Sequence, residues 1–160
     1  MGRKLLAAVV AAGFTLGMAS LALAGPHWLK GTTEQKFKKL EDIQEAMGSV
    51  MMEFNQRMTT MYFAAKGGNW GLAAYQLDEA QEIAEVGEMT RPQFAADLKA
   101  FKSAHLSKVE EAIKSKSFDK FKGAFDDMVV ACNNCHAAHG YPFIHYALPD
   151  RPVESLKYTP

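Results

Sequence analysis

The stretch MGSVMMEFNQRMTTMYFAAKGGNW, residues 47–70, places apolar side chains at steps of three and four. That spacing lines one face of an α-helix, and the same stripe begins upstream of it. Thr32 followed by Gln35 forms a capping box, which predicts a helix start at that point. We therefore expect one long helix from about residue 33 to Lys66, ended by the glycine pair that follows. The stripe consists of Phe37, Leu40, Ile43, Met47, Val50, Met51, Phe54, Met58, Met61, Tyr62 and Ala65.

Three more helices follow with connections of only a few residues. Asn69 is the expected N-cap of a second helix that ends at Gly87. Thr90 and Gln93 make another capping box for a third helix, which continues to about residue 113. Ser117 is the expected N-cap of a fourth helix. Four amphipathic helices with short links predict an all-α fold, an antiparallel up-down-up-down four-helix bundle over residues 25–140.

The first 24 residues have the layout of a secretory signal peptide. Arg3 and Lys4 precede a long apolar run, which ends in the small-x-small sequence of residues 22–24. We expect cleavage after Ala24 and a periplasmic location for the mature chain. The alternative is an uncleaved membrane anchor, since the apolar run is close to the length of a membrane span. No basic stripe accompanies the mature sequence, so a nucleic-acid partner is not expected.

Both cysteines and two of the five histidines lie in ACNNCHAAHG, residues 131–140. Two cysteines in an exported chain could form a disulfide, a redox dithiol, part of a zinc site or a haem attachment site. The order C-x-x-C-H is the attachment signature of c-type haem. It predicts one covalent haem c with thioether bonds to Cys132 and Cys135 and with His136 as the proximal iron ligand.

The segment after the fourth helix, residues 141–160, is rich in proline and aromatic residues. Gly140 and Pro142 are expected to stop the helix. We expect an extended tail that packs against the bundle, because a row of aromatic side chains rarely stays exposed.

The haem motif near the end of the last of four helices, together with the 47–70 segment, resembles class II c-type cytochromes, the group of cytochrome c′ and cytochrome c-556. The resemblance covers residues 33–139. It implies that the first helix supplies the distal face of the haem, with Met51 as candidate distal ligand and Met47 and Met58 as alternates. Methionines at helical spacing are also common core fillers, so their presence does not decide the ligand.

The resemblance implies an electron carrier with His/Met-ligated haem rather than an enzyme. Its alternatives are a five-coordinate protein that binds NO or CO, and a haem subunit of a larger redox complex. The expected partners are redox proteins, and the family implies a possible homodimer through the first helix. His139 and Gly140 depart from the resemblance, since family members commonly have an aromatic residue and an arginine there.

Overall fold

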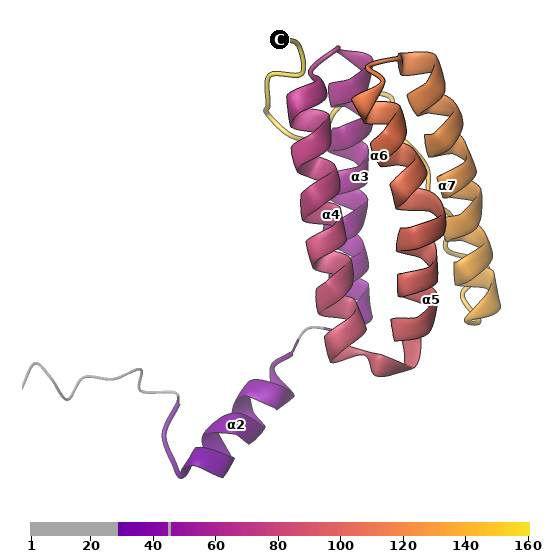
Figure 1. Cartoon of the computed structure of the whole chain (residues 1–160). Helices are drawn as coiled ribbons and strands as arrows, with labels where there is room; N and C mark the ends of the chain where they lie inside the picture. Colours follow the sequence, from indigo (N-terminus) through magenta and orange to yellow (C-terminus); the bar gives the residue numbers. More distant parts are fainter. Residues whose placement is uncertain (1–28, 45) are drawn as a thin grey trace, which may run out of the picture. The chain divides into compact units, whose positions relative to one another are not determined.

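The computed structural model describes residues 29–44 and 46–160, and the regular elements of this part are helices, without a strand (Figure 1). The predicted all-α class is therefore confirmed. The expected signal peptide, residues 1–24, lies outside the described residues. The chain divides into two compact units, Met1–Gln44 and Glu45–Pro160. Among the described residues, no helix combines the length and the apolar character needed to cross a bilayer.

The first unit contains helix α2, Thr33–Asp42. The predicted capping box is confirmed, because Thr32 N donates to Gln35 Oε1 at 2.9 Å and Gln35 N donates to Thr32 Oγ1 at 3.3 Å. The prediction of one helix from 33 to 66 was wrong, since α2 is capped at Ile43 and α3 starts at Met47. Helix α2 buries none of its residues, and a helix without tertiary packing of its apolar face has little to extend it.

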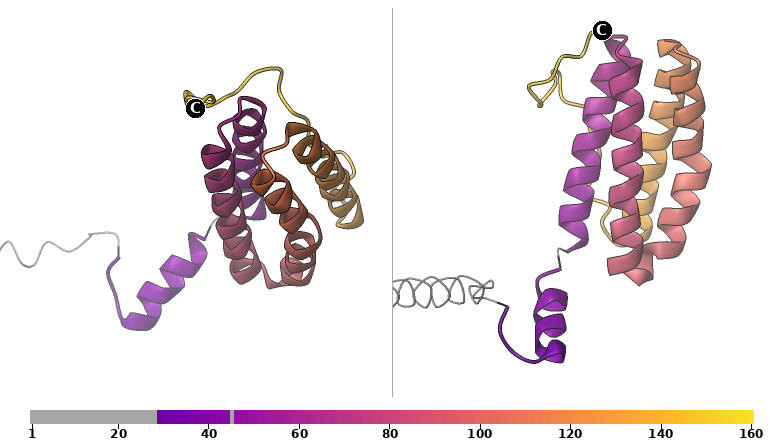
Figure 2. Two further views of the ribbon diagram at one scale, coloured as in Figure 1. Left: turned by 45° about the horizontal axis from the view of Figure 1, so that its top comes forward. Right: turned by 60° about the vertical axis from the view of Figure 1, so that its left-hand side comes forward.

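The second unit consists of α3 (Met47–Lys66), α4 (Trp70–Thr90), α5 (Ala95–Phe101), α6 (Ser107–Lys114) and α7 (Phe118–Ala138). A short 3-10 turn, Pro92–Phe94, precedes α5, and a π-helical turn, Lys102–Leu106, joins α5 to α6. Figures 1 and 2 show α3, α4, the α5–α6 rod and α7 lying side by side. Asn69 and Ser117 cap α4 and α7 with their side chains, as predicted.

Gly87 does not end the second helix, which was a wrong prediction. Helix α4 continues through Gly87 to Thr90, so Thr90 is not an N-cap either, and its hydroxyl donates to Val86 O at 2.7 Å. A Cβ at Gly87 would lie 3.2 Å from Val50 Cγ1 and 3.3 Å from Leu98 Cδ1. The glycine therefore lets α3 and α5 approach α4 closely. The helix ends just before Pro92, where proline disfavours helical geometry in the residue preceding it.

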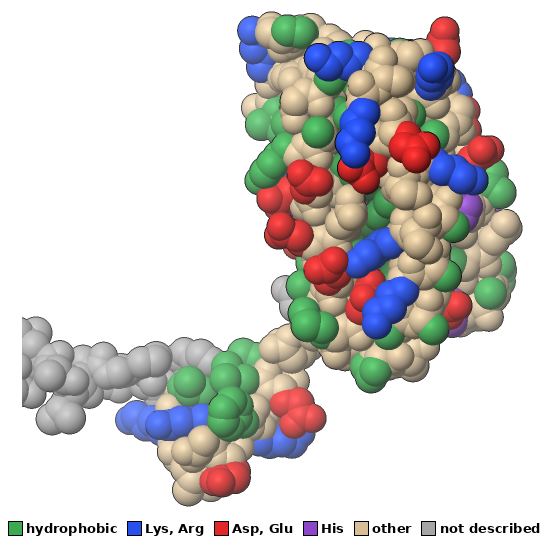
Figure 3. Space-filling model, in the orientation of Figure 1, with side chains coloured by type: hydrophobic (Ala, Val, Ile, Leu, Met, Phe, Trp, Pro, Cys, Tyr) green, Lys and Arg blue, Asp and Glu red, His purple; other side chains and the backbone are tan. Residues whose placement is uncertain are grey.

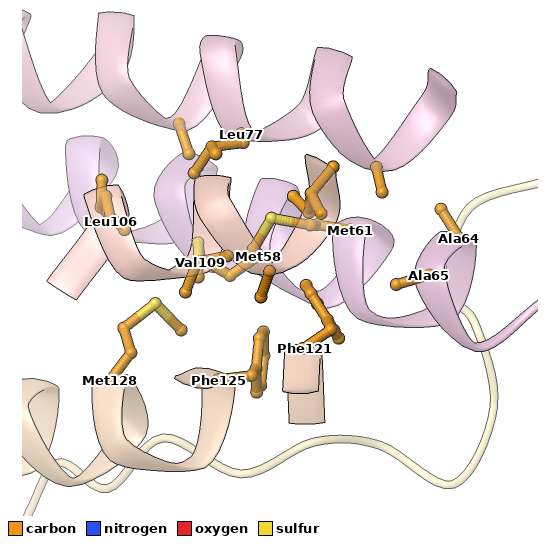
Figure 4. Packing of buried hydrophobic residues seen from close by; sticks show 14 of the residues in the cluster. Met58, Met61, Ala64, Ala65, Leu77, Leu106, Val109, Phe121, Phe125 and Met128 are labelled. Atoms are coloured by element: carbon orange, nitrogen blue, oxygen red, sulfur yellow. The ribbon is translucent and has the colours of Figure 1, made fainter. Parts of the chain in front are cut away.

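Aromatic and sulfur-containing side chains make up much of the core between the helices (Figure 4). Phe121 and Phe125 of α7 are fully buried, and their ring centroids are 5.6 Å apart. Tyr62 of α3 packs on both rings, with centroid distances of 6.2 and 5.1 Å. This cluster joins the first and last helices of the unit. Its buried neighbours include Met58, Met61, Leu77, Leu106, Val109 and Met128.

The C-terminal tail runs back along α3, so its predicted packing on the helices is confirmed from Tyr146 onward, whereas Tyr141 and Phe143 are exposed (Figure 2). Tyr146, Leu148 and Tyr158 pack against the core cluster. The Asn69 side-chain amide donates to Lys157 O at 3.1 Å, so the tail reaches the α3–α4 turn. A Cβ at Gly67 would collide with Tyr158 O, which shows how closely the two backbones approach.

On the face shown in Figure 3, lysine and arginine side chains alternate with aspartate and glutamate. The second unit contains exposed ion pairs such as Lys114 Nζ with Glu110 Oε1 and Lys122 Nζ with Asp126 Oδ2, both at 2.5 Å. Exposed pairs of this kind each contribute at most about 1 kcal/mol. The core rather than the surface charge is therefore the main source of stability.

Two glycines in open surroundings should respond oppositely to alanine. Gly123 lies inside α7 and Gly68 has φ +81°, and a Cβ at either would meet nothing within 4 Å. Gly123→Ala is expected to raise the free energy of unfolding by about 0.5–1 kcal/mol, because alanine favours the helix. Gly68→Ala is expected to lower it by about 1 kcal/mol, because a Cβ is strained at positive φ. Urea unfolding of both variants checks this, and equal shifts would contradict it.

Candidate functional site

The C-x-x-C-H motif occupies the last turns of α7, which ends at Ala138 with His139 as its C-cap. Cys132 and Cys135 are three residues apart, so they lie on neighbouring positions of one helix face. Both thiols are free, so the disulfide alternative does not describe this structure. Cys132 packs against the core cluster, whereas Cys135 is nearer the surface.

The surroundings of both thiols favour the neutral form. Burial raises the pKa of the Cys132 thiol to about 12, with a further contribution from Cys135. Burial also raises the pKa of the Cys135 thiol, with a smaller effect from the Asp97 carboxylate. Redox-active dithiols require the opposite, a lowered thiol pKa that yields a thiolate near neutral pH. The thiol electrostatics therefore do not support the dithiol alternative.

A structural zinc site requires four protein ligands. Within residues 29–44 and 46–160, no group of three or more His, Cys, Asp or Glu side chains comes together to hold a metal ion. The residues around Cys132 and Cys135 thus do not have the ligand number that zinc requires. A haem iron needs one or two protein ligands, so the same observation does not bear on a haem site.

His136 has its ring oriented by the tail. Its Nδ1 atom lies 3.1 Å from the carbonyl oxygen of Ile144. A carbonyl can only accept a hydrogen bond, so Nδ1 is the donor in this contact and Nε2 is the ring nitrogen that remains for a metal. Metal-ligating histidines usually donate their other ring N–H to such an acceptor. Two free cysteine sulfurs followed by an imidazole of this tautomer fit a covalently attached haem.

The first turn of α7 lies beside the last turns of α3. This contact determines which residues of the two helices are at the same height along the helix axes. Tyr62 near the end of α3 contacts Phe118, the first residue of α7, with ring centroids 5.8 Å apart. Its ring also contacts Phe121 one turn later. Going about three turns back from Tyr62 along α3 leads to Met51, and about three turns forward from Phe121 along α7 leads to Cys132. Met51 and Cys132 are therefore at about the same height.

The directions of the side chains around the two helix axes are consistent with Met51 facing α7 and Cys132 facing α3. Eleven residues at 100° each bring a side chain back to within about 20° of its starting direction. Met51 thus shares the face of α3 that Tyr62 turns toward α7, and Cys132 shares the face of α7 that Phe121 turns toward α3. Met51 is half-buried at this position. Met51 therefore lies level with Cys132 on the face of α3 that is turned toward α7.

The two alternate methionines lie elsewhere. The Met47 methyl carbon lies 3.5 Å from where a Cβ on Gly87 would be, so its side chain faces α4. Met58 is 1% exposed and belongs to the core cluster with Phe125 and Met128 (Figure 4). By the same residue count Met58 lies level with Phe125, about two turns from the motif, whereas Met47 lies level with His136 but directs its side chain toward α4. Met51 is therefore the methionine best placed among the three.

Within the described part of the chain, the other three histidines form side-chain contacts or are exposed. His139 Nε2 lies 3.0 Å from Asp97 Oδ2, and its ring meets Phe94 edge-on with centroids 5.0 Å apart. His139 thus joins the end of α7 to α5. His105 packs on Phe101, and His145 is exposed on the tail.

Four residues near the motif were missed by reasoning on the sequence. Tyr146 N donates to Asn133 Oδ1 at 2.9 Å, and the Tyr146 hydroxyl lies 3.3 Å from Thr59 Oγ1 of α3. Burial raises the pKa of Tyr146 to about 12, so the phenol is neutral. Ile144 is the fourth, through its carbonyl on His136. Only the aromatic composition of the tail could have signalled this, because the contacts depend on how the tail folds back.

A separate groove of about 480 Å³ lies between α3 and the tail. Polar and apolar side chains share its lining, including Met52, Gln56 and Val153. Neither cysteine of the motif lines it, and we do not assign the haem to it.

Comparison of the chain with known protein families, with curated proteins and with solved structures finds no match.

Proposed function

We propose that this protein is a monohaem c-type cytochrome that transfers single electrons between redox partner proteins. The observation that supports it most is the C-x-x-C-H motif with a His136 ring whose Nδ1 is bonded to the Ile144 carbonyl. Cys132 and Cys135 would form the thioether bonds, and His136 would be the proximal ligand. Haem c supplies an iron centre that accepts and releases one electron.

We also propose that the second unit is an antiparallel four-helix bundle of the class II cytochrome type, exported to the periplasm. Short connections between helices that lie side by side support this architecture, since they favour antiparallel neighbours. The contact of Tyr62 with Phe118 supports it as well, because it brings the end of α3 to the start of α7. The signal-like sequence of residues 1–24 supports export.

The visible spectrum of the purified holoprotein, oxidised and reduced, with and without CO, tests the proposed function. A low-spin spectrum with a methionine–iron band in the oxidised form and little response to CO is expected for an electron carrier. A high-spin spectrum that shifts on addition of CO would instead support a gas-binding protein with an open distal position. A protein without bound haem would contradict both.

Met51→Ala is expected to convert a CO-insensitive protein into one that binds CO. The reason is that Met51 lies level with the motif on the face of α3 toward α7, where it would act as the distal ligand. CO titration of the reduced variant, followed by absorbance, measures this. Met52→Ala is the matched control, because Met52 is the next residue and is 74% exposed. If Met51→Ala and Met52→Ala bind CO alike, Met51 is not the ligand.

A further inference from the structure

The start of the tail is bonded back onto the motif. Gly140 has φ +85° and reverses the chain at the end of α7. Tyr141 N then donates to His136 O at 2.8 Å, and His136 Nδ1 lies 3.1 Å from Ile144 O. A segment of only a few residues therefore touches both the backbone and the ring of His136.

Tyr146 anchors the far end of this segment between two helices. Its backbone N–H donates to the Asn133 side chain on α7, and its hydroxyl meets Thr59 on α3. Its ring lies against Phe125, with centroids 6.1 Å apart. Because Ile144 is only two residues before this anchor, the position of its carbonyl depends on Tyr146. Without the anchor, the segment that carries this carbonyl would be held only at Tyr141 on one side and from Leu148 onward on the other.

We propose that residues 141–146 are a strap that positions the proximal imidazole, with Asn133 and Tyr146 as the positioning residues. The inference rests on the proposed function, since it assigns a role toward the haem that His136 would ligate. The strap fixes the tautomer and the ring orientation of His136 and strengthens its donation from Nε2. Asn133, although it lies between the two cysteines, contributes by binding the tail and not by binding the haem.

This role predicts a specific effect on the reduction potential. A hydrogen bond from Nδ1–H to a carbonyl makes the imidazole a stronger donor, and a stronger donor stabilises oxidised iron. Asn133→Ala removes the acceptor for Tyr146 N and loosens the strap. We therefore expect the potential of the Asn133→Ala holoprotein to rise. We also expect exchange of the His136 Nδ1 proton with solvent to quicken by about tenfold, the equivalent of one lost hydrogen bond.

The experiment compares three holoprotein variants by redox titration and by NMR of the His136 ring proton. Asn133→Asp retains an acceptor oxygen and is expected to restore the wild-type exchange rate, while its added negative charge should lower the potential instead of raising it. Asn134→Ala is the matched control, because it is the neighbouring asparagine in the same motif and is exposed. We expect it to leave both quantities unchanged. Equal behaviour of the Asn133→Ala and Asn134→Ala variants would overturn the strap.

A second pair of variants covers the case in which Asn133→Ala fails to take up haem. Tyr146→Phe removes only the hydroxyl that meets Thr59, and Tyr141→Phe removes the hydroxyl of a mostly exposed tail residue. Faster exchange of the His136 ring proton in Tyr146→Phe alone supports the strap, and identical exchange in the two variants overturns it. A wild-type protein without attached haem overturns the proposed function itself. If haem is attached but the variants leave the potential and the exchange of the His136 ring proton unchanged, only the strap is overturned.

Discussion

Replacing Cys132 and Cys135 together by alanine is expected to abolish covalent haem attachment completely. The two free thiols lie on neighbouring positions of one face of α7, immediately before His136. Thioether bonds require both sulfurs, and the chain has no other cysteine to substitute for them. The intact mass of the protein after denaturation and a haem stain of a denaturing gel measure the outcome. In both measurements the wild-type chain should retain one haem, and the double variant should retain none.

Histidine variants separate attachment from ligation. His136→Ala is expected to remove the proximal ligand and to change the spectrum of any haem that remains attached. His139→Ala is the matched control, since His139 lies in the same last turn but is bonded to Asp97 instead. Its spectrum should match that of the wild type. A haem signal that survives denaturation in the double cysteine variant, or identical spectra for both histidine variants, would refute the assigned site.

Phe121→Ala is expected to cause a large decrease in the free energy of unfolding. Phe121 is fully buried, and its ring meets those of Tyr62, Trp70, Phe118 and Phe125. Truncation of a buried phenylalanine costs about 3–5 kcal/mol, from lost transfer free energy and the cavity that remains. A loss of that size is comparable with the whole stability of a small domain.

Urea unfolding followed by circular dichroism measures the change in free energy of unfolding. Phe143→Ala is the matched control, because Phe143 is 75% exposed on the tail and its removal should change stability by no more than about 0.5 kcal/mol. Similar losses for Phe121→Ala and Phe143→Ala would mean that the α3–α7 aromatic cluster does not dominate the core. The midpoint alone is not sufficient, so the slope of each transition should be compared as well.

The helical class and most helix starts could be predicted from local sequence. Thr32, Asn69 and Ser117 cap helices as expected, because a cap is a contact between residues three positions apart. The errors occurred where distant contacts decide. The expected continuous first helix stops at Ile43, and the glycine at position 87 serves close helix packing instead of a helix end. A pattern of apolar residues does not show which part of the apolar stripe packs against another helix.

The candidate site divides in the same way. Cys132, Cys135 and His136 are adjacent in the sequence, so their spacing alone indicated the chemistry. Met51 could be proposed as distal ligand only from the resemblance. Its height relative to Cys132 depends on the aromatic contacts between α3 and α7. The contacts of Tyr146 with Asn133 and Thr59 could not be predicted, because the sequence of the tail does not show where on the helices it packs.

By itself the sequence determined the helical class, the capped helix starts and the C-x-x-C-H motif, because each depends on residues within a few positions of one another. Only the tertiary structure decided the height of Met51 relative to Cys132 and which carbonyl accepts from His136. The physical reason is that these relations are set by packing between α3, α7 and the tail. That packing brings together residues far apart in the chain, and apolar periodicity shows that a face will be buried but not what will cover it.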